Sequence, residues 1–356
     1  MKNKDTKIRI KDIATLAGVS EGTVDRVLHN RGEVSAKSRE AVTKVLEEMN
    51  YSPNIFARSL ASKKLYRYAC LIPLFNKGDY WESVDAGFDQ AANDFSQYNV
   101  RIEKYYYDQF DVSSFVNVSQ TILLNEPDAV FIAPIFREET LSFTNELMSK
   151  NIAFSFIDSL IEEAAFHTYY GQNSFQSGYI AAKLLLNSLP DESEVLVLRT
   201  KRQGALSNQT IARNKGFLHY INLNNLTNIK LINAELKDGD DQLNINVLKQ
   251  IFTDNVNIKA AIVFNSKVYR LAKYLDEINH ADVRLIGYDL LDQNVNYLKH
   301  DVISYLIAQR PDKQAYLSVR DMCRELIFKQ ETKRINYVPI DVLIKENIED
   351  YVLFQE

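Results

Sequence analysis

Residues Ile10–Leu28 read IKDIATLAGVSEGTVDRVL and indicate how the N-terminal part of the chain folds. Its apolar residues recur at helical spacing in two short groups, and Gly18 and Ser20 lie between them. Gly18 suits the left-handed position that ends a helix, and Ser20 suits the N-cap of the next helix. Two short helices joined by a tight turn are therefore predicted, which is the arrangement of a helix-turn-helix.

A third apolar group, Ala41–Met49, predicts another helix that begins after Ser35. In a helix-turn-helix, the first helix braces against the phosphate backbone and the second places its N-terminal side chains in the major groove. The spacing assigns Val24, Val27 and Leu28 to the core. It leaves four residues of the second helix facing outward: Glu21, Gly22, Asp25 and Arg26. An ordinary helical hairpin with solvated charges is the alternative interpretation.

The composition narrows the class of protein. The chain has 356 residues, 46% apolar and 25% charged, which is typical of a globular protein of two or three domains. Its two cysteines, Cys70 and Cys323, are too few for a disulfide framework and favour a reducing compartment. No leader-like segment and no apolar run of about 18 residues is present, so we expect a cytoplasmic protein without a membrane partner.

The charge is unevenly distributed along the chain. Residues 1–64 hold 13 Lys and Arg against 8 Asp and Glu, although the whole chain has a net charge of −5. A local positive excess of this kind is typical of a segment that binds a polyanion. We therefore expect the N-terminal end to bind nucleic acid.

From Tyr66 onward, short apolar runs alternate with amphipathic helical stretches, which predicts a parallel sheet covered by helices on both faces. The clearest predicted helices are Ser83–Phe95, Ser113–Leu124, Thr140–Ser149 and Phe175–Leu186. Polar residues follow seven of the apolar runs: Asn76, Arg137, Asp158, Arg199, Asn265, Asp289 and Gln309. Because ligands bind outside the carboxyl ends of parallel strands, these residues predict a ligand site. The alternative is that they are ordinary surface loop residues.

Residues 8–64 resemble the LacI family of bacterial transcription regulators. The matching features are the Ala-x-x-Ala-Gly-Val-Ser-x-x-Thr-Val-x-Arg-Val-Leu core, Val34-Ser35, and the hinge pattern within 50–60. The resemblance implies that Glu21, Gly22 and Arg26 read bases, with Ser20 and Thr23 in the same DNA-binding set. Arg26 would pair with guanine in a bidentate manner, and Glu21 would accept from cytosine N4. Gly22 and Asp25 depart from the usual family residues.

The same resemblance implies a hinge helix that forms on DNA. In the family, a leucine of this helix wedges into the minor groove, a role that falls on Leu60, with Ala57 allowing close approach and Asn54 in the DNA-binding set. A helix of about eight residues is marginal in water, so its order is expected to depend on DNA and on a second copy of the chain. The alternative is that Leu60 is a linker residue packed on the following domain.

Residues 66–356 resemble the type I periplasmic sugar-binding fold of LacI-family regulators. The resemblance implies a helix-turn-helix domain (1–50), a hinge and linker (51–64), and a ligand-binding domain (65–356) of two α/β lobes. The N-lobe is expected at about 65–168 and 303–330, and the C-lobe at about 169–302 and 331–356.

The resemblance also implies the residues that bind the ligand. Asp289 and Gln309 match positions that hold sugar hydroxyls in ribose-type binding proteins, and Asn265 follows the preceding strand. The remaining candidates are Asp79, Tyr80, Trp81, Arg137, Asp158, Asn173 and Arg213. Ser159 stands where ribose-type proteins have Arg, so ribose itself is not expected. Carboxylates, amides and a flat aromatic face suit a carbohydrate, although a purine could also stack there.

We therefore predict a ligand-responsive regulator, a repressor of carbohydrate-utilisation genes. Its expected partners are a near-palindromic double-stranded DNA operator, a carbohydrate effector, and a second copy of the chain in a homodimer or higher oligomer. The sequence contains no GxGxxG, P-loop or HExxH motif, so no cofactor, metal or catalytic residue is predicted. The alternative is a sugar-binding module or sugar-metabolising enzyme whose helical N-terminus serves oligomerisation. A receptor for a transported solute is disfavoured because no signal segment is present.

Overall fold

The computed structural model describes residues 9–28, 32–49, 64–187, 189–201, 206–237, 241–280 and 282–353. The chain divides into two compact units, Met1–Ser62 and Lys63–Glu356. We call them the head and the ligand-binding unit. No described helix is both long enough and apolar enough to cross a lipid bilayer.

Three helices form the head: α1 (Ile10–Ala17), α2 (Glu21–Leu28) and α3 (Ala36–Glu48). They pack around a small core of Ile13, Ala14, Val24, Val42 and Val45. Gly18 ends α1 in the left-handed conformation, with φ of 64°. The hydroxyls of Ser20 and Ser35 accept hydrogen bonds from the backbone N–H groups three residues later, each at 3.2 Å. The three predicted helices and their caps are confirmed.

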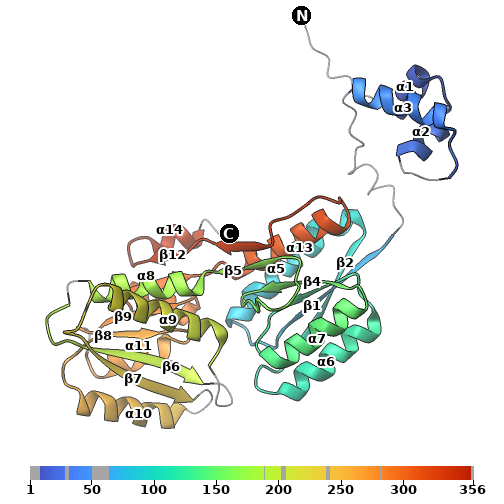
Figure 1. Cartoon of the computed structure of the whole chain (residues 1–356). Coiled ribbons are helices and arrows are strands. Elements are labelled where there is room, and N and C mark those ends of the chain that lie inside the picture. The colour runs from blue at the N-terminus through green and yellow to red at the C-terminus, as the bar shows by residue number, and fades with distance from the viewer. Residues whose placement is uncertain are drawn as a thin grey trace, which may run out of the picture. The chain divides into compact units, whose positions relative to one another are not determined.

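The N-lobe of the ligand-binding unit is a six-stranded parallel sheet in the order β11-β5-β4-β3-β1-β2. Its strands are β1 (Tyr66–Pro73), β2 (Val100–Tyr107), β3 (Ala129–Ile132), β4 (Ala153–Ile157), β5 (Tyr169–Gln172) and β11 (Ile335–Val338). Helices α6 (Val112–Asn125) and α7 (Arg137–Ser149) pack together, and α5 (Tyr80–Phe95) packs with α13 (Pro311–Leu326) (Figure 1). A short 3-10 helix, η1 (Ser96–Tyr98), follows α5. The central strands are buried, as parallel strands covered on both faces must be.

The C-lobe repeats this architecture with a six-stranded sheet in the order β12-β10-β9-β8-β6-β7, in which only β12 is antiparallel to its neighbour. Its strands are β6 (Glu194–Lys201), β7 (Lys230–Lys237), β8 (Ile258–Val263), β9 (Arg284–Tyr288), β10 (Tyr305–Ala308) and β12 (Asp341–Leu343). Its helices are α8 (Ser174–Leu186), α9 (Asn208–Leu223), α10 (Asp241–Asp254), α11 (Tyr269–Glu277), α12 (Asp292–Lys299) and α14 (Ile348–Leu353). The predicted two-lobed α/β fold is confirmed.

Three chain segments cross between the lobes, and their positions differ from the expected lobe boundaries. β5 and β11 pair with each other in the N-lobe sheet, although residues from 169 and from 331 were expected in the C-lobe. β10 pairs with β9 and β12 in the C-lobe sheet, although residues from 303 were expected in the N-lobe. The hydrogen-bonded pairing of these short strands therefore places the crossings at the end of each strand, after β5, after β10 and after β11.

Candidate functional site

A cleft of about 100 Å³ lies between the two lobes, where the carboxyl ends of strands from both sheets meet. Asp158 follows β4 of the N-lobe, whereas Asp289 follows β9 and Gln309 follows β10 of the C-lobe. Both aspartates are buried and have left-handed backbone conformations, with φ of 68° and 71°. Aspartate tolerates this conformation better than most residues, and strained backbone is concentrated at functional sites. The chain therefore turns sharply out of each strand and leaves a carboxylate at the cleft.

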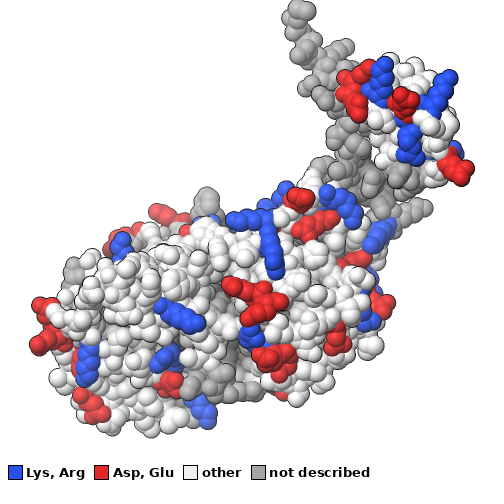
Figure 2. All heavy atoms as spheres, viewed as in Figure 1, with Lys and Arg blue, Asp and Glu red and all other residues white. Residues whose placement is uncertain are grey.

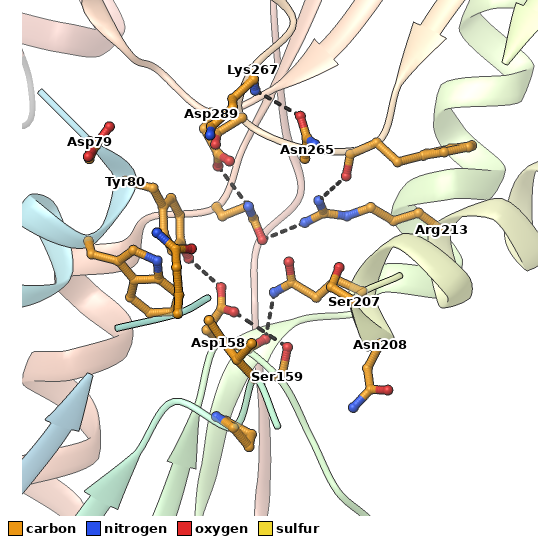
Figure 3. A pocket seen from close by; sticks show the side chains of 18 residues that line it. Asp79, Tyr80, Asp158, Ser159, Ser207, Asn208, Arg213, Asn265, Lys267 and Asp289 are labelled. Carbon is orange, nitrogen blue, oxygen red and sulfur yellow. Dashed lines mark hydrogen bonds between the residues drawn. The ribbon is translucent and has the colours of Figure 1, made fainter. Parts of the chain in front are cut away.

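Arg213, Gln309 and Asp289 form a buried chain of hydrogen bonds within the C-lobe side of the cleft (Figure 3). Arg213 Nη2 donates to Gln309 Oε1 at 2.6 Å, and Gln309 Nε2 donates to Asp289 Oδ1 at 2.7 Å. Arg213 Nη1 also donates to the carbonyl oxygen of Phe264 at 2.7 Å. The guanidinium lies 3.8 Å from the ring centroid of Tyr288, which is a cation–π contact. Two hydrogen bonds and one ring therefore fix the orientation of this arginine.

Asp158 links the opposite wall of the cleft to elements of both lobes. The Tyr80 hydroxyl donates to Asp158 Oδ1 at 2.7 Å, and Gln209 Nε2 on α9 donates to the Asp158 carbonyl oxygen at 2.9 Å. The backbone N–H of Asp158 donates to Gln314 Oε1 at 3.0 Å, while Gln314 Nε2 donates to the carbonyl oxygen of Gln309 at 2.8 Å. The cleft is thus closed by direct polar contacts between the lobes.

The electrostatics of the cleft are set by its burial. The pKa of Asp289 is raised to about 7, chiefly by burial and to a smaller extent by Asp158, whereas Arg213 and Gln309 act to lower it. Burial also raises the pKa of the Tyr80 hydroxyl well above its usual value, and the neighbouring Asp158 contributes to that increase. Perturbed groups of this kind gather at binding and catalytic sites. The cleft is therefore a polar site whose groups bond to one another and could exchange these partners for ligand hydroxyls.

The structure places eight of the ten predicted ligand residues at the cleft: Asp79, Tyr80, Trp81, Asp158, Arg213, Asn265, Asp289 and Gln309. Two of these bond mainly to their own loops. The Asp79 carboxylate accepts from the Asn76 backbone N–H at 2.9 Å, and Asn265 Oδ1 accepts from the Lys267 backbone N–H at 2.9 Å. The Tyr80 and Trp81 rings meet edge to face with centroids 5.1 Å apart.

The other two predicted residues lie elsewhere. Arg137 begins α7 and pairs with the carboxylates of Glu163 at 2.5 Å and Glu138 at 3.2 Å, so its charge is neutralised outside the cleft. Asn173 caps α8, where its side chain accepts from the Gln176 backbone N–H at 3.0 Å. It lines a neighbouring cavity and not the cleft itself.

Sequence reasoning missed Gln209 and Gln314. A signal for Gln209 was present, since it precedes Arg213 by four residues and therefore lies on the same face of α9. No comparable signal marks Gln314, because its role depends on how α13 packs against the crossover after β10.

In the head, the predicted base-reading residues are placed on the outside of α2. Glu21, Gly22 and Arg26 are exposed and Val24 is buried. Ser20 and Thr23 bond to each other through their hydroxyls at 3.0 Å at the start of the helix. The hinge residues Asn54, Ala57 and Leu60 lie outside the described residues.

Charge on the head is balanced within the three-helix region. Residues 9–49 contain seven Lys and Arg and seven Asp and Glu, and both signs are interspersed on the face seen in Figure 2. The positive excess of the first 64 residues therefore comes from the flanking segments 1–8 and 50–64. Among the described residues, no group of three or more His, Cys, Asp and Glu is arranged to hold a metal ion.

Comparison with known proteins identifies both parts of the chain. Residues 9–54 match the family of bacterial regulatory proteins named lacI, and residues 69–330 match the periplasmic binding protein domain family. The HTH-type transcriptional regulator MalR of Streptococcus pneumoniae is 35% identical over 99 residues, which are 27% of this chain and 30% of MalR. The sucrose operon repressor of Staphylococcus xylosus is 26% identical over 177 residues, which are 49% of this chain and 52% of the repressor. The chain therefore spans about a third to a half of the length of these curated relatives.

A solved structure matches more of the chain. A protein from Bacteroides fragilis, described as a LacI transcriptional regulator, is 38% identical with a TM-score of 0.76 over 81% of this chain and 100% of that one. The family match at residues 9–54 covers the helix-turn-helix. The chain belongs to the LacI family of bacterial regulatory proteins, with a helix-turn-helix head and a periplasmic-binding-protein-like domain.

Proposed function

We propose that the protein is a transcriptional repressor whose affinity for an operator changes when a carbohydrate binds between the lobes. One observation carries the proposal: a helix-turn-helix head with exposed Glu21, Gly22 and Arg26 is part of the same chain as a buried polar cleft at the carboxyl ends of two parallel sheets. A solute-binding module or an enzyme would not need the head. The relatives MalR and the sucrose operon repressor carry regulatory names, which supports the same proposal.

The chemistry of the cleft supports a carbohydrate effector. Asp158, Asp289 and Gln309 supply carboxylate and amide groups that can bond to neighbouring hydroxyls, and each hydrogen bond to a charged group contributes about 1.5–3 kcal/mol. Tyr80 and Trp81 supply an aromatic wall for the apolar face of a sugar ring. The name of the sucrose operon repressor agrees with an effector of this class.

The DNA-binding part of the proposal is tested at Arg26. The operator is first selected from random duplexes with the full-length protein, and the affinity is then measured by fluorescence anisotropy. Because Arg26 is exposed on α2, Arg26→Ala should lose about 1–3 kcal/mol of operator-binding free energy. It should also relax the base preference at one position in each half-site. Lys44→Ala on α3 is the control, since Lys44 is an exposed cation outside α2 and should leave the base preference unchanged. Equal base preferences of the wild type and Arg26→Ala would exclude this reading of the head.

The coupling part is tested at Asp289. Asp289→Asn keeps the size of the side chain and an acceptor for Gln309, but it removes the carboxylate that we assign to the effector. The variant should bind the operator normally without effector, and its response should require a much higher effector concentration. An unchanged midpoint of the effector titration would remove Asp289 from the site.

A further inference from the structure

A second cavity, of about 200 Å³, adjoins the interlobe cleft. Four residues line both spaces and form the partition between them: Asp158, Ser159, Asn208 and Gln209. Across the partition, Gln209 Nε2 on α9 of the C-lobe donates to the carbonyl oxygen of Asp158 of the N-lobe at 2.9 Å. A rotamer change of Gln209 would break this bond and join the two spaces.

The cleft alone is small for the ligands that such sites hold. Its volume is about 100 Å³. Pockets for small organic ligands usually begin at about 300 Å³. The cleft and the second cavity together, at about 100 Å³ and 200 Å³, approach this size.

The walls of the second cavity repeat the chemistry of the cleft. Tyr337 on the edge strand β11 and Phe175 on α8 are 51% and 40% exposed, so both rings offer apolar surface to a ligand. Asn173 and Asn208 add amide groups, and Glu162 adds a carboxylate. In Figure 3 the side chain of Asn208 points away from Asp289 and Lys267. Aromatic faces with amides and a carboxylate between them suit a second sugar ring.

A buried acceptor at this cavity lacks a hydrogen-bond partner. Gln172 ends β5 and is 1% exposed, and its Nε2 donates to the Ala308 carbonyl oxygen at 2.9 Å. Its Oε1 has no partner within the part of the chain that the structure describes. A buried oxygen without a partner is energetically unfavourable, and a ligand hydroxyl that reached it would remove this penalty.

From these four observations we propose that the effector is a disaccharide, with one ring in the cleft between Trp81 and Asp289 and the other in the second cavity against Tyr337 and Phe175. The proposal rests on the proposed function, because it specifies the effector of the same site. Gln209 moves aside when the two-ring ligand enters, and Gln172 Oε1 accepts a hydroxyl of the second ring.

The test is isothermal titration of the full-length protein with glucose, galactose and fructose, and with maltose, cellobiose, lactose, sucrose and melibiose. We expect one of the disaccharides to bind at least about tenfold more tightly than either of its component monosaccharides, a difference of about 1.4 kcal/mol. Tyr337→Ala should weaken that disaccharide by about tenfold and leave the monosaccharide affinity unchanged. Tyr106→Ala is the matched control, because Tyr106 is a 38% exposed tyrosine on β2, the opposite edge strand of the same sheet.

A second variant fills the cavity and removes no contact. Ala212 on α9 lines the second cavity but not the cleft, so Ala212→Phe should block the second ring and spare a monosaccharide. Tightest binding by a monosaccharide, no binding by any of the five disaccharides, or equal effects of Tyr337→Ala and Tyr106→Ala would each overturn the proposal. Operator binding is measured in parallel. A monosaccharide that shifts operator affinity would leave the proposed function standing while the disaccharide assignment fails.

Discussion

The carboxylate of Asp289 lies at the cleft, in a buried environment that favours its protonated form. The ordinary pKa of an aspartate is about 3.9, and burial raises the pKa of Asp289 to about 7. The folded chain therefore holds this proton more tightly than the unfolded chain does. The protonated carboxyl group therefore makes its full contribution to the free energy of unfolding below about pH 4. This contribution is lost as the pH rises to about 7.

Because the pKa is raised, the wild type and Asp289→Asn should differ in how their stability changes with pH. Asparagine is uncharged at every pH, so the variant should gain melting temperature relative to the wild type as the pH rises from about 4 to about 7. The difference in unfolding free energy between the two proteins should change by at most about 1.4 kcal/mol per pH unit. Differential scanning calorimetry at several pH values gives the difference, and a difference that is constant across this range would contradict the prediction.

Arg213 is held by groups that only a guanidinium can satisfy together. It is 1% exposed, donates to Phe264 and Gln309, and lies over the Tyr288 ring. A lysine has a single point charge without the planar fork, so Arg213→Lys should leave a buried acceptor unpaired and lose about 1–3 kcal/mol of unfolding free energy, together with effector affinity. Arg137→Lys is the control, since its ion pairs lie outside the cleft and both quantities should stay unchanged. Denaturant titration and calorimetric binding measure the two effects.

At the scale of elements, helices α8 and α9 approach each other so closely that a side chain does not fit between them. A Cβ added at Gly178 would lie 1.9 Å from the carbonyl oxygen of Arg213, and one at Gly216 would lie 1.9 Å from that of Phe175. This contact holds Arg213 at the cleft and Phe175 at the second cavity. The positions of Arg213 and Phe175 are therefore set by two glycines that line neither the cleft nor the second cavity.

We predict that Gly178→Ala displaces α9 and weakens effector binding. Overpacking of this kind costs about 1–3 kcal/mol, more than the roughly 0.5–1 kcal/mol that alanine gains over glycine inside a helix. Gly22→Ala on α2 is the matched control, because the nearest atom to its added carbon is Ser20 Oγ at 3.8 Å. Thermal melting and effector titration should show losses for Gly178→Ala alone, and an unchanged effector affinity in that variant would disprove the role of the contact.

The elements also show what the sequence could and could not predict. Buried central strands such as β4 and β9 are continuous apolar runs, so their positions and the polar residues after them were predictable. The edge strands β2 and β7 read VRIEKYYY and KLINAELK, and their polar residues conceal the strand pattern. Arg137 follows an apolar run as Asp158 does, so the same pattern predicted it at the site. In the structure it forms an ion pair with Glu163 and does not line the cleft. Long-range pairing of this kind leaves no local signal.

At the scale of the whole molecule, the lobes are joined at strand ends that buried glutamines tie together. Gln172 connects the end of β5 to the end of β10, and Gln314 connects Asp158 after β4 to Gln309 after β10. Both side chains are 1% exposed. An effector that replaces cleft bonds would therefore act next to the crossings, where we expect a small change to alter the angle between the lobes. Its influence on DNA is limited to its differential affinity for the open and closed states, typically about 1–3 kcal/mol.

Operator binding by a homodimer should depend strongly on the salt concentration. One recognition helix covers few base pairs, so two heads should bind two half-sites of a near-palindromic operator about one helical turn apart. If the dimer neutralises about 6–10 phosphates, its affinity should fall by roughly three to five powers of ten between about 50 and about 200 mM salt.

Because charge in residues 9–49 is balanced, we expect the flanking segments 1–8 and 50–64 to supply most of the phosphate contacts. Replacing Lys2, Lys4 and Lys7 by Gln together should reduce the salt slope by up to about three per protomer, as each lost phosphate contact removes about one. The same number of Lys→Gln changes at Lys150, Lys259 and Lys273 in the ligand-binding unit is the control. Sedimentation of the protein–operator complex and anisotropy across the salt range give the stoichiometry and the slope. A monomer on one asymmetric site, or equal slopes for the two triple variants, would contradict this account of how the chain holds DNA.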